Sequence, residues 1–348
     1  MESVIIGGDF GQQAKESSVI NKLAEALGSE KLNGGSISDI EFATTSLSNF
    51  DLVVWAPNIN NDIEKLYPKK SNGSILICSK VLRENRDFGD AVARIFKMNA
   101  NAVIAIDSTS RPFTFNLIDA LGNIWCKTSD IIELSNKIID LYKWTKASTR
   151  IGSNNAIFSK NELCDLELTE LCDIVRGVAD KVENERGGRY FGNVSTRCAK
   201  MFPSYRIAED IILMSGRNSA KDRLTNEDFV FTKLLDNNVL YHGDRKPSVD
   251  TPIQLNMYKD YKNINFIIHG HAYIDDAVTT EHYFPCGDLR ELSAVKEKID
   301  TNANEIILNL KNHGFVIGAN TITDLKRIIS SSNFKYRKIG EEVAHGQS

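Results

Sequence analysis

The sequence has no strongly basic block, no apolar run long enough to cross a membrane, and no pair of cysteines spaced C-x-x-C. With a formal net charge of −4 and no basic block, nucleic acid is not an expected partner. The lack of a long apolar run argues against a membrane-spanning segment. The first apolar stretch, residues 4–6, is too short for the core of a signal peptide, so we expect a cytoplasmic protein.

The cysteines agree with that expectation. Six are present, at Cys78, Cys126, Cys164, Cys172, Cys198 and Cys286. A chain of this size is not a small disulfide scaffold, and we interpret them as mostly reduced thiols of a cytosolic protein. The contents of 42% hydrophobic and 25% charged residues are ordinary for a globular protein. A length of 348 residues exceeds one ordinary core and predicts two domains.

The N-terminal half alternates short apolar runs with helical patterns. Strands are predicted at residues 3–6, 52–55, 74–78 and 102–106, and helices at 17–27, 90–98 and 130–144. Residues 112–118 and 122–126 fit an antiparallel edge hairpin. This alternation predicts an α/β fold, with a Rossmann-like, doubly wound parallel sheet domain over residues 1–147.

A glycine-rich turn, residues 7–11, follows the first strand. Between a strand and a helix, backbone N–H groups can bind an anion, and Asp9 and Lys15 would be the first residues to test for a nucleotide site. The turn matches neither G-x-G-x-x-G nor a P-loop, however. Tight-turn geometry explains the glycines equally well.

Small polar residues predict an interdomain linker at 148–158, a second domain at 159–335 and a flexible tail at 336–348. In the second domain, helices are predicted at 166–184, 289–299 and 323–330, and strands at 211–215, 229–232 and 305–310. Residues 191–197 can offer donors to an anion, or simply form a turn into a strand. Ser248 or Asp250 could cap a helix that runs up to Lys259.

Residues 265–272 form an apolar run that contains two histidines, His269 and His271. Side chains two apart in a strand share one face, so both imidazoles point the same way. Such a pair is half of a transition-metal site, or two histidines that close a strand and hydrogen-bond locally. His313 lies in a tight turn between two predicted strands, which would hold a third ligand on a rigid scaffold. His282 could be an extra ligand or a surface residue.

These pieces resemble the class II aldolase/adducin family, represented by fuculose-phosphate aldolase and ribulose-phosphate 4-epimerase. The matching segments lie between about residues 160 and 335, in the family's order. They are 192–197 (GNVSTR), 223–225 (RLT), 247–250 (PSVD), 269–272 (HGHA), 290–292 (REL) and 312–314 (NHG). The N-terminal half lies outside the resemblance.

The resemblance implies a class II aldolase-like α/β domain with Zn2+, or another divalent metal, on His269, His271 and His313. It places the catalytic carboxylate at Asp250. Tyr283 is the nearest candidate for the family's tyrosine acid, with a packing aromatic as the alternative. The resemblance also implies phosphate binding by the following residues: Asn193, Ser215, Gly216, Arg217, Asn218 and Ser248. The implied protein is a homo-oligomer, commonly a tetramer. Its implied activity is lyase chemistry on a small phosphorylated sugar or ketose through a metal-stabilised enediolate, which a three-histidine zinc can support as a Lewis acid.

The sequence departs from the family pattern at three points. Asp250 stands where aldolases carry glutamate, Val249 replaces a serine, and Arg217 stands where a small residue is usual. The segment between His271 and Arg290 is also short. Epimerase, dehydratase or decarboxylase chemistry at the same metal therefore stays open, as does a non-catalytic adducin-like scaffold.

Overall fold

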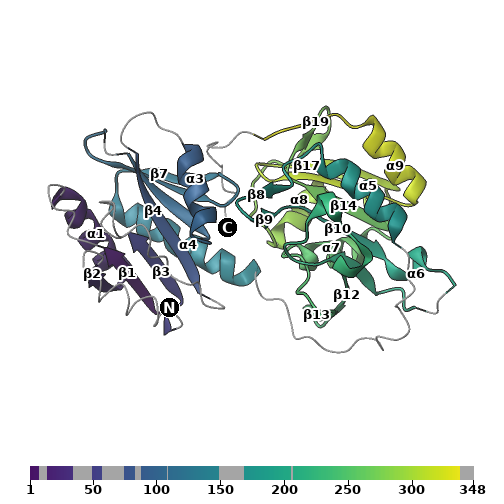
Figure 1. Cartoon of the computed structure of the whole chain (residues 1–348), viewed down its shortest axis with the longest axis horizontal. Coiled ribbons are helices and arrows are strands. Elements are labelled where there is room, and N and C mark those ends of the chain that lie inside the picture. The colour runs from purple at the N-terminus through teal and green to yellow at the C-terminus, as the bar shows by residue number, and fades with distance from the viewer. Residues whose placement is uncertain are drawn as a thin grey trace. The chain divides into compact units, whose positions relative to one another are not determined.

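The structure is a computed structural model that describes residues 1–7, 14–33, 49–56, 74–82, 88–107, 109–148, 168–204 and 207–337. It divides into two compact units, Met1–Lys146 and Ala147–Arg337. Each unit is built on one large sheet (Figure 1). Most of the predicted linker and tail lies outside the described residues. Within the described residues, none of the helices combines the length and apolar character that a membrane crossing requires.

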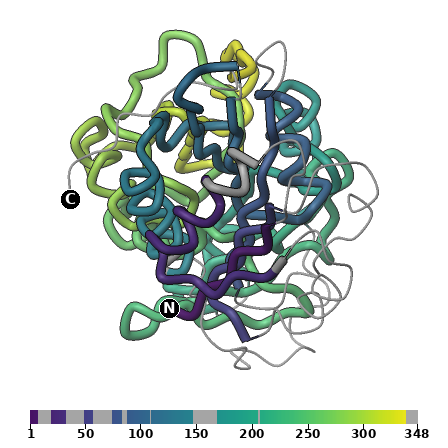
Figure 2. The backbone as a smooth tube through the Cα atoms, turned by 90° about the vertical axis from the view of Figure 1, so that its left-hand side faces the viewer, coloured from purple at the N-terminus to yellow at the C-terminus, as the bar shows by residue number. Residues whose placement is uncertain are grey.

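The first unit has a seven-stranded sheet in the order β2-β1-β3-β4-β5-β6-β7. Its first five strands pair in parallel, and the last two pairings are antiparallel. Figures 1 and 2 show β1 beside β3 at the purple end of this sheet. The strands are β1 Ser3–Gly7, β2 Glu30–Asn33, β3 Leu52–Ala56, β4 Ile75–Leu82, β5 Ala102–Asp107, β6 Thr114–Asp119 and β7 Ile124–Thr128. The helices are α1 Ala14–Leu27, α3 Phe88–Lys97 and α4 Ile131–Ser148.

The predicted strands, helices and edge hairpin of this half are confirmed, and so is a mixed α/β fold with a parallel sheet. Buried apolar strands explain the success, because β1, β3 and β5 are buried along their whole length. Gly7 ends β1 where a Cβ would lie 2.3 Å from the side chain of Ile20, so packing of α1 requires glycine there. Residues 8–11 and the side chain of Lys15 lie outside the described part of the structure.

The second unit has an eight-stranded sheet in the order β13-β12-β11-β10-β14-β18-β17-β16, in which only β16 and β17 pair in parallel. Its strands are β10 Asn193–Arg197, β11 Ile212–Ser215, β12 Phe229–Leu235, β13 Asn238–His242, β14 Phe266–Gly270, β16 Val278–Thr279, β17 Glu305–Leu310 and β18 Gly314–Ala319. Short two-residue strands form two further ladders, β8 Glu185–Arg186 with β9 Arg189–Tyr190 and β15 Tyr273–Ile274 with β19 Phe334–Lys335. The described helices are α5 Thr169–Ala179, α6 Cys198–Met201, α7 Thr251–Asp260, α8 Arg290–Lys298 and α9 Ile322–Ser331, with 3-10 turns at Lys221–Arg223 and Asn226–Asp228.

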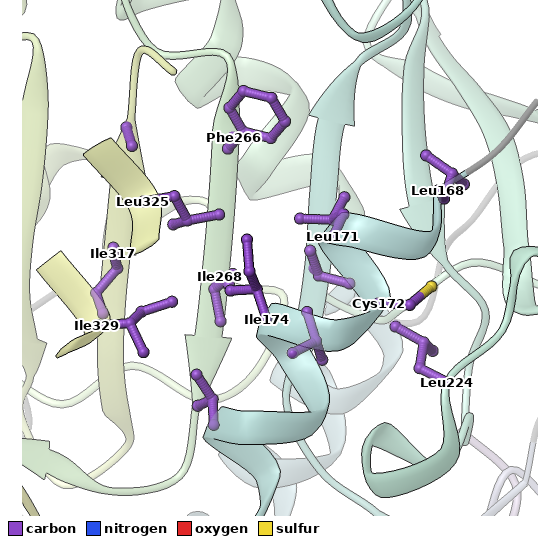
Figure 3. Close-up of a cluster of buried hydrophobic side chains, with 14 of the residues drawn as sticks. Leu168, Leu171, Cys172, Ile174, Leu224, Phe266, Ile268, Ile317, Leu325 and Ile329 are labelled. Carbon is purple, nitrogen blue, oxygen red and sulfur yellow. The ribbon is translucent and has the colours of Figure 1, made fainter. Parts of the chain in front are cut away.

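Two helical layers cover this sheet. Helices α5 and α9 pack on one face in an apolar cluster, and α7 and α8 pack on the other. Figure 3 shows part of the first cluster, with Leu171, Ile174, Leu325 and Ile329 from the helices and Ile268 and Ile317 from the sheet. Alternation along β14 assigns Ile268 to the first face and Ile267 to the second.

One prediction for this unit needs correction, and one open alternative is decided. The helix expected at 166–184 ends at Ala179, because Glu183 instead forms a β-bridge with His271. Residues 193–197 form the central strand β10. Of the two interpretations of residues 191–197, the turn into a strand is therefore the one that the structure supports. The side chains of β10 are buried although most of them are polar, so the sequence has no apolar pattern that predicts this strand.

Candidate metal centre

Strand β14 carries His269 at the centre of the sheet. His269 lies opposite Asn193 of β10 and Val316 of β18 in the antiparallel register. His271 follows directly after the strand, and its ring stacks on Phe191 with centroids 4.8 Å apart. The two imidazoles thus leave the same end of one buried strand, as the spacing predicted.

His313 reaches the same point from the turn between β17 and β18. The turn lies close to β14, because a Cβ on Gly314 would come 2.1 Å from the carbonyl oxygen of Gly270. Any other residue at 314 would push the turn away from the strand. Glycine there therefore positions the third imidazole.

The three rings converge. Their centroids are 4.6 Å apart for His269 and His313, 5.3 Å for His269 and His271, and 5.4 Å for His271 and His313. One ring nitrogen from each lies within 4.8 Å of the others. All three side chains are at least 95% buried. Three imidazoles in this arrangement match the ligand set of a catalytic zinc site.

The hydrogen bonds fix which nitrogens are available. Nδ1 of His269 lies 2.8 Å from the carbonyl oxygen of Phe315, which can only accept, so Nδ1 carries the proton. Nδ1 of His313 lies 3.0 Å from Oε2 of Glu291 in the same way. Nε2 of His269 and Nδ1 of His271 are buried and have no hydrogen-bond partner among the described residues. Buried, unpartnered imidazole nitrogens are costly in a dry interior, and a bound metal ion would satisfy them.

The charges at the site differ between the histidines. Burial and the nearby His313 lower the pKa of His269 to about 4. Burial and the other two histidines lower the pKa of His271 well below its ordinary value. Burial opposes protonation of His313 too, but Cys286 and Glu291 outweigh it and raise its pKa well above the ordinary value. Two ligands are therefore neutral as metal binding requires, and binding at the third must release a proton.

Asp250 occupies the N-cap position of α7 but makes no side-chain capping hydrogen bond, unlike the cap proposed from the sequence. Instead Oδ2 accepts a hydrogen bond from Nδ2 of Asn193 at 2.8 Å. Oδ1 is buried and has no partner among the described residues. One oxygen of Asp250, Sγ of Cys286 and a ring nitrogen of His313 lie within 4.8 Å of one another. The carboxylate is thus beside the histidines and has one free oxygen.

A polar network positions Asp250. Nδ2 of Asn193 also donates to Oγ of Ser248 at 3.2 Å, and its Oδ1 accepts from Gln254. Ser195 then links Gln254 to Tyr258. In this structure the amide of Asn193, predicted to bind phosphate, is engaged with protein groups.

The other predicted phosphate ligands lie along neighbouring segments, because Ser248 N–H donates to the carbonyl of Ser215 and Gly216 forms a β-bridge with Pro247. Oγ of Ser215 accepts from the backbone N–H of Val194, and Gly216 N–H donates to the carbonyl of Asp228. Oδ1 of Asn218 accepts from Tyr190 N–H on an exposed stretch. Arg217 differs, because Nε and Nη2 of its guanidinium are buried without a partner among the described residues. Burial lowers the pKa of Arg217, and the negative charge of Asp250 opposes that shift.

His282 does not join the three histidines in either ligand grouping found among the described residues. Tyr283 is 1% exposed and packs in the interior, whereas His282 is exposed. His282 is thus a surface histidine, one of the two interpretations open from the sequence. Tyr283 as the catalytic acid stays a prediction.

Three residues of the centre carry no signal by themselves in the sequence. Cys286 and Glu291 contact His313, and Lys221 is buried close enough to influence His269. Burial lowers the pKa of Lys221 to about 8, and its Nζ donates to the carbonyl of Ser219 at 2.6 Å. The resemblance included Glu291 in a motif but gave it no role.

A cavity of about 710 Å3 lies elsewhere in this unit. Its lining includes Arg197, Lys200, Lys259 and Lys262, together with acidic residues of the same surface. Arg197 stands at the opposite end of β10 from Asn193. None of the three histidines lines this cavity, so it is separate from the candidate metal centre.

Comparison with known families identifies one match, the Class II Aldolase and Adducin N-terminal domain, over residues 170–280. The match lies wholly in the second unit and includes His269, His271 and Asp250, but it ends before Cys286, Glu291 and His313. The resemblance predicted from the motifs is confirmed for this segment, and the first unit lies outside it.

Solved structures give weaker likenesses. An L-fuculose 1-phosphate aldolase is 17% identical, with 52% of this chain and 83% of that chain covered and a TM-score of 0.35. The l-fuculose-1-phosphate aldolase from Thermus thermophilus is 12% identical, with 46% and 89% covered and a TM-score of 0.32. The N-terminal class II aldolase domain of a conserved protein from Thermoplasma acidophilum is 15% identical, with 51% and 96% covered and a TM-score of 0.34.

Proposed function

We propose that the second unit, which carries the class II aldolase and adducin domain, is a metal-dependent lyase that cleaves or forms a carbon–carbon bond in a small phosphorylated sugar or ketose. Zn2+ or another divalent ion would be held by His269, His271 and His313. The observation that carries the proposal is the convergence of three buried imidazoles, two with unpartnered nitrogens. Such an ion supplies a Lewis acid for charge developing on the substrate's oxygens.

Asp250 is the proposed acid/base. Its Oδ1 has no partner among the described residues, its other oxygen is held by Asn193, and the carboxylate lies close to His313. A carboxylate fixed in this way can take and return a proton without first reorienting. Aspartate reaches one methylene less far than glutamate, so substrate carbons must sit closer to α7 than a glutamate would need.

Arg217 is the proposed anchor for a substrate anion. Its buried guanidinium has two nitrogens without partners, and a phosphate would accept hydrogen bonds from both. Ser248, whose Oγ already accepts from Asn193, would be a neighbouring donor. Anchoring the phosphate positions the reacting carbons relative to Asp250.

The test begins with metal content. Purified full-length protein should contain stoichiometric zinc or another divalent ion, and His269→Ala and His313→Ala should lower zinc affinity by at least about 100-fold, because removing a ligand costs more than removing an outer partner. Exposed His282→Ala is the matched control and should retain metal. Metal-free wild type with no affinity for added zinc would contradict the proposal.

The reaction is tested separately, on a panel of sugar phosphates. Release of an aldehyde supports the lyase, and formation of an epimer or loss of water or CO2 assigns the same centre to another reaction. Asp250→Asn should abolish the activity while metal stays bound. A metal-loaded protein whose cellular function survives Asp250→Asn would instead be an adducin-like scaffold.

For the first unit we propose a Rossmann-like domain. The order β2-β1-β3-β4-β5 reverses direction between β1 and β3, and ligands bind at such a switch point in doubly wound sheets. Isothermal titration with nucleotides tests the site. A homotetramer, proposed from the family resemblance, is tested by light scattering.

A further inference from the structure

Cys286 lies in the segment between β16 and α8, outside the matched family segment. Its Sγ is 3.2 Å from Nε2 of His313, the nitrogen that remains for a metal when Nδ1 faces Glu291. None of the four other cysteines that the structure describes belongs to either ligand grouping. Cys286 is therefore the thiol beside His313. Its Sγ groups with Asp250 and His313 and not with all three histidines, so ligation of one shared ion requires a side-chain movement toward His269 and His271.

The distance suits two ligands of one ion. At bond lengths of about 2.0–2.1 Å to nitrogen and about 2.3 Å to sulfur, tetrahedral geometry separates the two donor atoms by roughly 3.6 Å. The observed separation of 3.2 Å is within a small side-chain adjustment of that value. Nε2 of His269 and Nδ1 of His271, both buried and unpartnered, point independently to a ligand at this place.

Resting on the proposed metal centre, we infer that Cys286 supplies a thiolate as the fourth protein ligand of the ion held by His269, His271 and His313. The S–H bond breaks when the sulfur–metal bond forms, and the proton leaves to solvent. Neither partner is oxidised or reduced. A softer set of three nitrogens and one sulfur favours zinc or cobalt over magnesium or calcium.

Ligation of the ion by Cys286 would affect turnover. Four protein ligands complete a tetrahedral shell, whereas catalytic zinc sites keep one position open. With His269, His271, His313 and Cys286 as its ligands, the ion would have no open position, and Cys286 would be the ligand to give way to a substrate oxygen. Until substrate arrives, the bound metal would shield the Cys286 thiol, and the thiol would shield the metal.

The test uses Co2+ in the full-length protein. Wild type should show visible cobalt bands and a near-ultraviolet thiolate-to-cobalt charge-transfer band. Cys286→Ser should keep the visible bands, lose the charge-transfer band and bind zinc at least about tenfold more weakly. Cys126→Ala, a buried cysteine of the first unit, is the matched control and should behave as wild type.

The outcomes are distinguishable. Visible cobalt bands with no thiolate band in wild type would overturn the Cys286 inference and leave the proposed centre intact. Failure of wild type to bind cobalt or zinc would overturn both. Should Cys286→Ser fail to fold, alkylation of wild type decides the question: zinc should slow modification of Cys286 by iodoacetamide, and an unchanged rate would contradict ligation.

Discussion

The two faces of the eight-stranded sheet are built from the same strands but have different chemistry. On the α5 and α9 face, the central strands contribute apolar side chains such as Val194 and Ile268 to one cluster. Ile268 is labelled in Figure 3. On the α7 and α8 face, the next residues along the same strands are Ser195 and His269, which enter polar contacts. Adjacent positions of one strand thus contribute to different layers.

The difference shows how a polar centre is supported inside a protein. Hydrogen-bonded groups such as Ser195, Gln254 and Asn193 hold the carboxylate of Asp250 without contributing much net stability. The apolar face supplies the burial that offsets this cost. We expect substitutions on the two faces to separate stability from metal binding.

The largest effect is expected on the apolar face. Leu171, fully buried in α5, packs against the sheet, and Leu171→Ala should lower the free energy of unfolding by about 2–5 kcal/mol. Metal bound per folded protein should stay unchanged. Exposed Leu235→Ala is the control and should cost less than about 0.5 kcal/mol in urea unfolding. Loss of metal from the folded fraction of Leu171→Ala would show that the faces are not separable.

A buried charge gives the next effect. Burial lowers the pKa of Lys221 from 10.5 to about 8, so the unfolded state binds more protons between these values and stability rises with pH there. Below pH 8 the buried charge of Lys221 lowers the free energy of unfolding by its full amount, up to about 3 kcal/mol at about 1.4 kcal/mol per pKa unit. Lys221→Met should therefore gain stability over wild type at pH 7, with the gap shrinking toward pH 10.5.

Thermal unfolding across pH 7–10.5 measures that gap. Lys221→Met also loses the hydrogen bond to the carbonyl of Ser219, which changes the stability of the variant by an amount that does not depend on pH. Lys311→Met removes an exposed lysine of the same unit and should leave the pH dependence as in wild type. A constant difference between wild type and Lys221→Met would contradict the shifted pKa.

The smallest effect is expected at Glu291. Its carboxylate accepts from Nδ1 of His313, and a carboxylate behind a ligating histidine raises the basicity of the ligand. Glu291→Gln keeps an acceptor but removes the charge, and should weaken zinc binding about tenfold, equivalent to about 1.4 kcal/mol. Chelator competition measures it, with exposed Glu281→Gln as the control. Unchanged affinity would mean that Glu291 only packs.

Sequence periodicity predicted the elements that bury continuous apolar surface. The strands and helices of the first unit and the strand at Phe266–Gly270 were found in this way. It missed β13, where exposed and buried residues mix, and gave no clear strand for polar β10. A buried polar strand is stabilised by partners far away in the chain, and local sequence patterns do not predict those partners.

For the candidate site, spacing predicted that His269 and His271 share a face, and the turn before Gly314 suggested His313. The roles of Cys286 and Glu291 could not be predicted, because their approach to His313 depends on how the segment before α8 folds back. Asp250 was expected near the site from the resemblance, but its partner Asn193 appears only through the β10–β14 register.

The place of β14 in the chain also determines when its sheet can be completed during synthesis. Its neighbours are β10, made well before it, and β18, made well after it. During synthesis the pair His269 and His271 leaves the ribosome before β16, β17 and β18 of its eight-stranded sheet, and the turn carrying His313 follows only with β18. Such long-range pairing forms late, since loop closure must precede the contacts that reward it. The nascent chain therefore exposes two histidines before it can select a metal, so an ion captured early would bind with incomplete ligands and exchange freely until β18 joins the sheet.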